Sequence, residues 1–167
     1  MQQRSTRSPN QSFRQGSCTA IPLDDASVDL VVTFETIEHI EEHEAFIAEI
    51  LRVLRDDGLL IVSTPERGNY NPTLNAPNPY HLREMAQSDL AELLCARFKH
   101  VCTLGQRVDY GSVVVGQATG QATGQAQRHG VFRGDFRRVE FSDSLAKPIF
   151  LVAVCRNVPL PAILVWL

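Results

Sequence analysis

The sequence has 167 residues, of which 44% are hydrophobic and 21% charged, and its formal net charge is −3. A chain of this length and composition can bury one hydrophobic core, which excludes a wholly disordered protein. The negative net charge argues against nucleic acid as an electrostatically held partner. The cysteines (Cys18, Cys95, Cys102 and Cys155) are scattered without a C-x-x-C pair. They predict reduced, mostly buried thiols in a cytoplasmic protein rather than a disulfide framework or a zinc site.

The two ends of the chain predict neither a signal peptide nor a membrane span. Residues 1–11 are polar and Arg-bearing, and we expect them to form a disordered start. Residues 149–167 are apolar enough to raise the question of a membrane span, but Arg156, Pro159 and Pro161 interrupt them. We expect a buried strand over 149–155, followed by a short apolar tail over 158–167.

In chain order, the first elements predict one β-α-β unit. Residues 12–16 are a candidate short strand. Residues 30–34 (LVVTF) are a nearly continuous apolar run, typical of a parallel strand buried on both faces. Residues 43–55 predict an amphipathic helix, which we expect Gly58 to end with a positive φ, and residues 59–63 predict the next buried strand. The helix would pack one apolar stripe against the sheet, formed by Phe46, Ile47, Ile50, Leu51 and Leu54.

The second half predicts fewer elements. Residues 66–80 form a loop rich in Asn, Pro and Gly, long enough to suggest a functional lid. A helix over 87–98 and strands over 100–104 and 149–155 follow. Residues 116–127 repeat G-Q-A-T and predict a flexible surface insertion. The pattern indicates an α/β domain over 12–157, with a Rossmann-like, mostly parallel sheet and flanking helices.

Ligands of open α/β sheets bind beyond the carboxyl ends of the strands, so the residues there are the candidate site. The strand over 30–34 leads into Glu35, Glu38 and His39, with E-x-x-E-H spacing. If this segment is helical, the three side chains share one face and form a half-site for a divalent metal. The alternative is that acidic residues at a helix start simply complement the helix dipole.

The loop after the strand over 59–63 carries polar and aromatic side chains that suit a hydroxylated acceptor such as a sugar. A surface loop without a ligand would look much the same. The candidate substrate contacts are Tyr70, Asn71, Tyr80, His81 and Arg83.

Residues 21–65, and more weakly 13–155, resemble the second half of a class I S-adenosylmethionine-dependent methyltransferase domain of type 11. The resemblance implies S-adenosylmethionine as cofactor. It places the Ser17–Cys18 turn against the adenine, although the family's commonest residue there is Asp. It also places Phe34 and Glu35 against the methionine part of the cofactor.

The E-x-x-E-H element is similar to the metal-binding element of small-RNA 2′-O-methyltransferases and of some ubiquinone-pathway O-methyltransferases. His81 stands where the first of these families has a further histidine, which implies a metal set of Glu35, Glu38, His39 and His81. The other reading makes His39 or His81 a general base or a substrate contact. The string over 78–84 (NPYHLRE) resembles methyltransferases of bacterial polysaccharide synthesis, which favours a glycan acceptor.

The chain departs from the family at its start. The first strand, the Gly-rich loop and the second strand with its ribose-binding acid are missing, and no G-x-G-x-G string follows any predicted strand. The family's sheet order would leave a central edge bare, and self-association through that edge is one consequence. A truncated gene, a degenerate fragment and a half domain completed by another chain all account for this, and we expect truncation.

Two functions follow. The first is S-adenosylmethionine-dependent O-methylation of a small-molecule or glycan acceptor. The alternative is a catalytically inactive methyltransferase-like fragment that acts as a binding protein. A nicotinamide-dependent oxidoreductase lacks its G-x-G-x-x-G motif here, and an α/β-hydrolase lacks its G-x-S-x-G elbow.

Overall fold

The structure is a computed structural model that describes residues 10–70, 78–107 and 148–160. Most of the predicted disordered start, residues 71–77 of the predicted lid loop, the G-Q-A-T repeat and the end of the apolar tail lie outside these residues. The described elements, in chain order, are β1 (Val28–Phe34), η1 (Ile37–His39), α1 (His43–Val53), β2 (Leu54–Pro65), α2 (Gln87–Cys95), β3 (His100–Gln106) and β4 (Phe150–Arg156).

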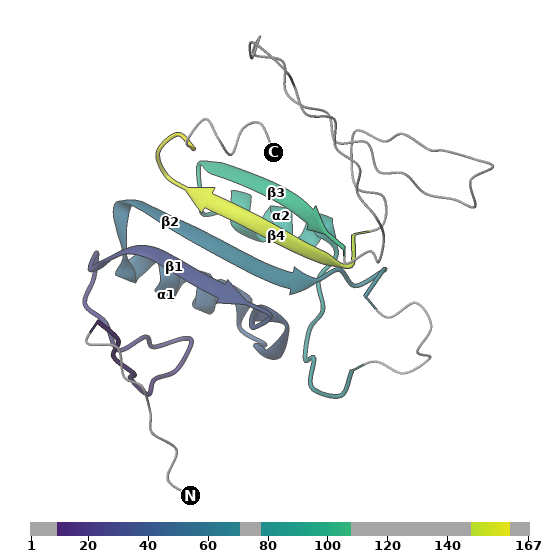
Figure 1. The fold of residues 1–167 in the computed structure, drawn as a ribbon, viewed down its shortest axis with the longest axis horizontal. Coiled ribbons are helices and arrows are strands. Elements are labelled where there is room, and N and C mark those ends of the chain that lie inside the picture. Colours follow the sequence, from purple (N-terminus) through teal and green to yellow (C-terminus); the bar gives the residue numbers. More distant parts are fainter. Residues whose placement is uncertain (1–9, 71–77, 108–147, 161–167) are drawn as a thin grey trace, which may run out of the picture.

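The strands form one sheet in the order β1-β2-β4-β3. β1 and β2 are parallel, whereas β4 is antiparallel to both of its neighbours, β2 and β3. β1, β2 and β3 therefore point the same way and β4 alone is reversed (Figure 1). The predicted β-α-β unit is confirmed as β1-α1-β2, and the α/β fold class is confirmed with it; in the described sheet the β1–β2 pairing is parallel and the two pairings of β4 are antiparallel.

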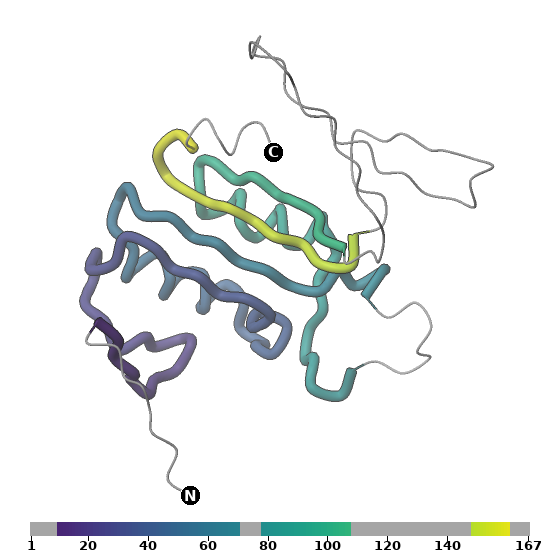
Figure 2. Tube along the Cα trace, in the orientation of Figure 1, coloured from purple at the N-terminus to yellow at the C-terminus, as the bar shows by residue number. Residues whose placement is uncertain are grey.

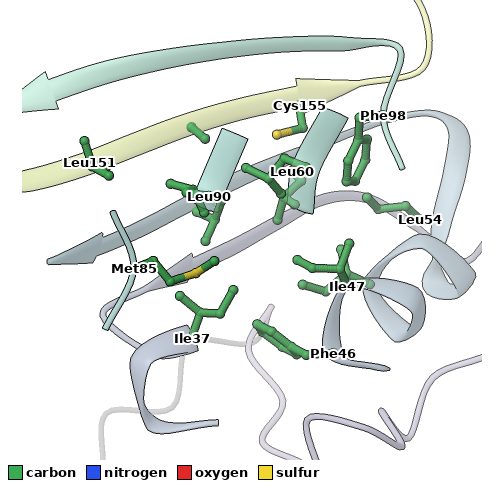
Figure 3. Packing of buried hydrophobic residues seen from close by; sticks show 14 residues of the cluster. Ile37, Phe46, Ile47, Leu54, Leu60, Met85, Leu90, Phe98, Leu151 and Cys155 are labelled. Atoms are coloured by element: carbon green, nitrogen blue, oxygen red, sulfur yellow. The ribbon is translucent and has the colours of Figure 1, made fainter. Parts of the chain in front are cut away.

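Both α-helices pack on one face of the sheet, and the core lies between them and the strands (Figure 1). Ile47 and Ile50 of α1 and Leu90 and Leu94 of α2 are fully buried there. Figure 3 shows their neighbours around Leu60 of β2. This helix layer contains the stripe that the sequence predicts, since Phe46, Ile47 and Ile50 are buried.

The opposite face of the sheet carries no helix within the described residues. Residues paired across neighbouring strands point to the same side, so Leu30, Val32 and Phe34 share this face with Leu59 and Ile61 of β2. Leu30, Val32 and Phe34 are 50%, 51% and 56% exposed. The prediction that this strand is buried on both faces is therefore wrong for β1. The strand forms where the apolar run predicts it, but among the described residues helices cover only one of its two faces.

Residues 10–27, which precede β1, are irregular and do not form the predicted strand over 12–16; an isolated bridge joins Ser17 to Ala20. Side chains of α1 hold its later part: Glu49 accepts a hydrogen bond from the Ile21 amide, and Arg52 donates to the Ile21 and Leu23 carbonyls and to Asp25. Figure 2 follows this segment to the start of β1.

The predicted end of the first helix is also wrong. α1 ends at Val53 and β2 begins at once with Leu54. Gly58 lies inside β2, where the β1–β2 register shifts between Val28 and Leu30. A Cβ at Gly58 would lie 2.8 Å from Leu54 Cδ2 and 2.9 Å from the Arg55 carbonyl oxygen. Glycine is needed here for close approach of the backbone rather than for a positive φ.

Replacing Gly58 by Ala should therefore destabilise the domain. The Arg55 carbonyl is backbone and cannot rotate away, so β2 must shift, at a cost of about 1–3 kcal/mol for such overpacking. Urea unfolding followed by circular dichroism measures the change. A loss below about 0.5 kcal/mol would mean that the bulge relaxes freely and that the contact is not a constraint.

The cysteines are less buried than predicted. Cys155 is fully buried, whereas Cys95 is exposed and Cys18 and Cys102 are intermediate. Burial raises the pKa of the Cys155 thiol to about 12. No helix in the described ranges is both long and apolar enough to cross a membrane.

Candidate functional site

The carboxyl ends of β1 and β2 meet at one edge of the sheet because the two strands are parallel neighbours (Figure 1). The chain leaves β1 at Phe34 and enters η1 two residues later. It leaves β2 at Pro65 and returns to this edge with residues 78–86, where Met85 pairs with Glu66. The backbone carbonyl of Glu38 accepts hydrogen bonds from the Leu82 and Arg83 amides at 2.8 and 3.1 Å. Two segments that are far apart in sequence are thus joined at the candidate site.

The Glu35 side chain is hydrogen-bonded to β2 and does not join the other predicted metal ligands. Its carboxylate accepts a hydrogen bond from the Ser63 hydroxyl at 2.6 Å, and its amide donates to the Ser63 hydroxyl and carbonyl oxygens. Glu35 has φ 48°, in the left-handed region, and only Ile37–His39 are helical. The expected helix face shared by Glu35, Glu38 and His39 does not form, because the turn at Glu35 precedes the helix.

Glu38 is a buried carboxylate, with 1% of the residue exposed. The Thr64 hydroxyl donates to its Oε2 at 3.3 Å. Burial raises the pKa of the Glu38 carboxyl, and the nearby charge of Glu35 adds to the rise. The side chain faces the end of β2 rather than solvent, so it does not act as a mere dipole partner on an exposed helix start.

His39 has a defined tautomer. Its Nδ1 lies 2.6 Å from the Tyr80 carbonyl oxygen, which can only accept, so Nδ1 carries the hydrogen. The lone pair is then on Nε2, which lies 3.8 Å from Glu38 Oε1. This side chain is 43% exposed.

His81 has the same tautomer for a different reason. Its Nδ1 lies 2.7 Å from Glu84 Oε1, and a carboxylate oxygen accepts, so Nδ1 donates. Its Nε2 accepts a hydrogen bond from Asn78 Nδ2 at 3.0 Å. The side chain is only 5% exposed. Its ring lies edge-on to His39, with 5.0 Å between centroids, and 5.4 Å from the ring of Tyr70.

Glu38, His39 and His81 therefore form one cluster, here called the Glu38–His39–His81 cluster. One ligand atom from each residue lies within 4.8 Å of the others. Three of the four residues in the predicted metal set are brought together, and Glu35 is excluded by its contact with Ser63. The arrangement can hold a proton or a cation beside a partly open edge of the sheet.

The remaining predicted residues are spread around this edge. Tyr70 packs between His81 and Phe150. Tyr80 is 76% exposed, and its carbonyl oxygen accepts the hydrogen bond from His39 Nδ1. Arg83 instead lines a surface hollow between α1 and α2, together with His43 and Asp89. Asn71 lies outside the described residues.

The predicted cofactor residues divide into two groups. Phe34 and Glu35 lie at the end of β1, beside the cluster. Ser17 lies in the turn before β1, where its hydroxyl contacts the Thr19 hydroxyl at 3.0 Å and accepts from the Thr19 amide at 3.2 Å. Cys18 packs against the hydrophobic core. The polar contacts of this turn are local.

Sequence reasoning misses the residues that hold the cluster in place. Glu84 and Asn78 lie in the NPYHLRE string without a predicted role, and Ser63 and Thr64 are predicted only as a strand end. The signal for Glu84 is its i+3 spacing from His81. No sequence signal points to the Tyr80 carbonyl.

His43 is a separate buried histidine at the first residue of α1, 1% exposed. Neither of its ring nitrogens has a hydrogen-bond partner within the described residues. Burial lowers the pKa of His43 below 6.5, and the charge of Arg83 adds to the effect. A proton on this ring is therefore unfavourable in the folded state.

This depressed pKa predicts loss of stability in acid. Below pH 6.5, the ordinary pKa of histidine, His43 is protonated in the unfolded state but not in the folded state. The free energy of unfolding therefore falls as the pH drops below 6.5. His43→Leu should shrink the difference in stability between pH 8 and pH 5, measured by urea unfolding at both values. An unchanged difference would show that His43 does not contribute to the acid sensitivity.

The comparisons with known proteins agree with this architecture. Residues 1–62 match the sequence model of a family described as a methyltransferase domain. A probable S-adenosylmethionine-dependent methyltransferase of Mycolicibacterium smegmatis is 45% identical over 101 residues, which cover 59% of this chain and 39% of that protein. A protein with the same description from Mycobacterium tuberculosis is 44% identical over 90 residues, 53% of this chain and 33% of that one. Over these residues the chain is similar to S-adenosylmethionine-dependent methyltransferases.

Solved structures support the same fold. A Thermotoga maritima S-adenosylmethionine-dependent methyltransferase, described as a possible histamine N-methyltransferase, aligns with TM-score 0.52 at 18% identity, over 86% of this chain and 62% of that one. An Archaeoglobus fulgidus S-adenosylmethionine-dependent methyltransferase aligns with TM-score 0.51 at 12% identity, over 80% and 61%. The resemblance to class I methyltransferases is confirmed, and S-adenosylmethionine is the cofactor of these relatives. This methyltransferase-like chain spans about two fifths of the Mycolicibacterium relative's length.

Proposed function

We propose that this chain carries the acceptor side of an S-adenosylmethionine-dependent O-methyltransferase site, with a small-molecule or glycan hydroxyl as acceptor. The observation that carries the proposal is the pair of histidines at the carboxyl edge of β1 and β2, each with its Nδ1 within hydrogen-bond distance of an oxygen. Tyr70 stacks beside His81 and Tyr80 is exposed next to it, and such aromatic surfaces suit the apolar faces of a sugar ring.

The described residues fit part of the cofactor. Phe34 offers a half-exposed aromatic face at the end of β1, and the Glu35 carboxylate, held by Ser63, is an acceptor for a positively charged or N–H group. The Ser17 hydroxyl would give the adenine one weak contact. The sequence has no Gly-rich loop and no ribose-binding acid.

The proposed chemistry is in-line methyl transfer. The bound cofactor supplies the methyl group: its S–CH3 bond breaks as an acceptor O–CH3 bond forms, which leaves S-adenosylhomocysteine. In this proposal the Nε2 of His39 takes the proton of the acceptor hydroxyl, and the Nε2 of His81 can do so only after the hydrogen bond from Asn78 Nδ2 is displaced. Hydrogen bonds from Nδ1 to Glu84 or to the Tyr80 carbonyl hold that ring for the task. Most of the rate enhancement would come from positioning.

The alternative is a non-catalytic binding protein, and the uncovered face of β1 favours it. Leu30, Val32 and Phe34 are about half exposed on an edge strand, and edge strands with apolar faces invite pairing with another chain. In this proposal the chain associates with itself or with a partner through β1.

Calorimetry with S-adenosylhomocysteine, together with thermal unfolding, separates the two. Micromolar binding with a cooperative melt, followed by label transfer from methyl-labelled S-adenosylmethionine to a panel of sugars, would support the enzyme. A cooperative melt without binding would support the binding protein. Sedimentation velocity on the same sample measures self-association.

A further inference from the structure

We propose that the hollow between the start of α1 and one side of α2 binds a small monocarboxylate with a short apolar chain. The hollow has a volume of about 360 Å³, and His43, Arg83, Met85 and Leu93 are among the residues that line it. This volume lies at the lower end of the range for small-molecule sites. None of the histidines or cofactor residues of the proposed methyl-transfer site lines it, so the proposal goes beyond that function.

His43 is the buried polar group in the wall of the hollow. It is 1% exposed, and within the described residues neither ring nitrogen has a hydrogen-bond partner. The Ile37 and Ile40 carbonyls favour the charged ring but accept no hydrogen bond from it. Because burial lowers the pKa of His43, the ring is neutral at pH 7 and carries one N–H donor. A ligand oxygen that accepts this N–H would remove the cost of burying it unpaired.

The His43 ring is also free to meet a ligand. No hydrogen bond holds it in one orientation within the described residues, and χ2 of histidine has broad, roughly two-fold energy wells. A half-turn about χ2 exchanges nitrogen and carbon positions, so it can bring the N–H toward the hollow without breaking a hydrogen bond.

Arg83 supplies a positive charge beside this ring. Its side chain is exposed and forms no ion pair within the described residues, although its charge acts on both His43 and Asp89. Its backbone is fixed, because the Arg83 amide donates to the Glu38 carbonyl at 3.1 Å. A guanidinium binds a carboxylate through two parallel hydrogen bonds. A carboxylate next to His43 would therefore give Arg83 the partner that it lacks.

The start of α1 favours the same sign of charge. α1 begins at His43, and the preceding Glu42 makes no side-chain cap. The first amides of a helix have no partner within the helix, and the helix dipole favours an anion beside them. His43 and Glu44 of this first turn line the hollow.

Acidic side chains in the lining limit the ligand to one negative charge. Asp89 is engaged, because it pairs with Arg67 at 3.2 Å and accepts a hydrogen bond from a backbone amide at the start of α2. Glu44 and Glu92 are exposed and line the hollow together with a second cation, Arg97. A second negative charge on the ligand would be repelled by these carboxylates. A carboxylate therefore fits better than a phosphate dianion or a dicarboxylate.

The apolar part of the lining accounts for the chain of the ligand. Met85 is buried and Leu93 is half-buried, and both line the hollow beside the charged groups. A ligand of this class would place its carboxylate on Arg83 and His43 and its carbon chain on Met85 and Leu93.

Nuclear magnetic resonance titration of the ¹⁵N-labelled chain at pH 7 and constant ionic strength tests the site with three probes of equal chain length: sodium butyrate, 1-butanol and butylammonium chloride. We expect butyrate to bind with a dissociation constant of about 1–10 mM, as befits so small a ligand. It should shift the ring nitrogens of His43 and leave those of His100 on β3 unchanged. Butanol, butylammonium and inorganic phosphate should each bind about 10-fold more weakly or worse.

His43→Leu and Arg83→Gln should each weaken butyrate binding by about 10-fold, read from the backbone amide shifts. Arg55→Gln is the matched control, since Arg55 lies on β2 and pairs with Asp29, and it should bind within about 2-fold of the natural chain. Thermal unfolding of each variant separates lost binding from lost folding.

The proposal is overturned if butyrate leaves the His43 ring unchanged up to about 50 mM in the folded natural chain. Equal binding of butanol and butyrate, or folded His43→Leu and Arg83→Gln that bind butyrate like Arg55→Gln, would overturn it as well. No methyl donor or acceptor takes part in the titration, so failure of the proposed enzyme and failure of this site remain distinguishable.

Discussion

Leu60→Ala should lower the free energy of unfolding by about 2–5 kcal/mol, the range for deleting a fully buried leucine side chain. Leu60 is 0% exposed in the middle of β2, on the face that α1 and α2 cover (Figure 3). It is paired with Val31 of β1 and Cys155 of β4, so a cavity there would open between three strands and the helix layer. Because native proteins are only marginally stable, this loss is a large share of the total stability. Urea unfolding, monitored by far-ultraviolet circular dichroism, measures it.

Val32→Ala is the matched control on the other face of the same sheet. Val32 pairs with Ile61 and is 51% exposed, so its removal should cost about 1 kcal/mol or less. Equal losses in the two variants would contradict the one-sided core. They would show that the face of Leu30, Val32 and Phe34 is covered in solution, and sedimentation velocity would then reveal whether a second copy covers it.

The local elements were predictable because each leaves a periodic signal. The stripe of Phe46, Ile47 and Ile50 predicts α1, and the apolar runs predict β1, β2 and β4. The apolar runs do not predict which face of a strand a helix covers. An alternating or continuous apolar pattern predicts that a strand is buried. On one face of β1 the described residues do not bury the apolar side chains.

Gly58 illustrates a second limit. Asp-Asp-Gly after a helical pattern normally predicts a helix end with a positive φ at the glycine. Here α1 stops earlier and Gly58 lies in a bulged strand, where an added Cβ would come within 2.9 Å of the Arg55 carbonyl oxygen. Both arguments require a glycine, and only tertiary structure decides between them.

Part of the candidate site was predictable from a general rule for α/β sheets. Ligands gather at the carboxyl ends of parallel strands, and this rule selects His39 and the loop that contains His81 as candidates. Their grouping into one set was implied by the resemblance to small-RNA 2′-O-methyltransferases, and the structure places the two rings 5.0 Å apart. The rule does not predict that Glu35 turns away to Ser63, because that contact depends on a left-handed residue between strand and helix. It also gives no role to Glu84, whose partner is set by the local fold of the loop.

The fold explains why the cluster is ordered although its residues lie on connections. Ile37 anchors η1, because its side chain is fully buried in the hydrophobic core. The loop with His81 is fixed by two amides on the Glu38 carbonyl and by the pairing of Met85 with Glu66. Each segment thus positions the other, so a change in either should move both histidines together.

If the chain transfers methyl groups, His81→Asn should reduce kcat by about 10²–10⁴-fold, the usual contribution of one positioned proton acceptor. His81 donates Nδ1–H to the Glu84 carboxylate, which stabilises a positive charge on the ring, and its Nε2 accepts the proton once the hydrogen bond from Asn78 is displaced. His39 donates to a neutral carbonyl and is 43% exposed, so His39→Asn should cost less if the ring acts only as a base. Initial rates of label transfer, at saturating and at limiting acceptor, measure the two effects.

The matched control is His100→Asn, which removes an imidazole on β3 and should leave kcat unchanged. Because His81 also packs against Tyr70, a merely structural role would raise KM and lower the melting temperature together. A role in proton transfer lowers kcat while S-adenosylhomocysteine binding stays constant. Equal losses of kcat in His39→Asn and His81→Asn, reproduced by a metal chelator in the natural chain, would instead make both histidines metal ligands. The cation, rather than an imidazole, would then lower the pKa of the acceptor hydroxyl.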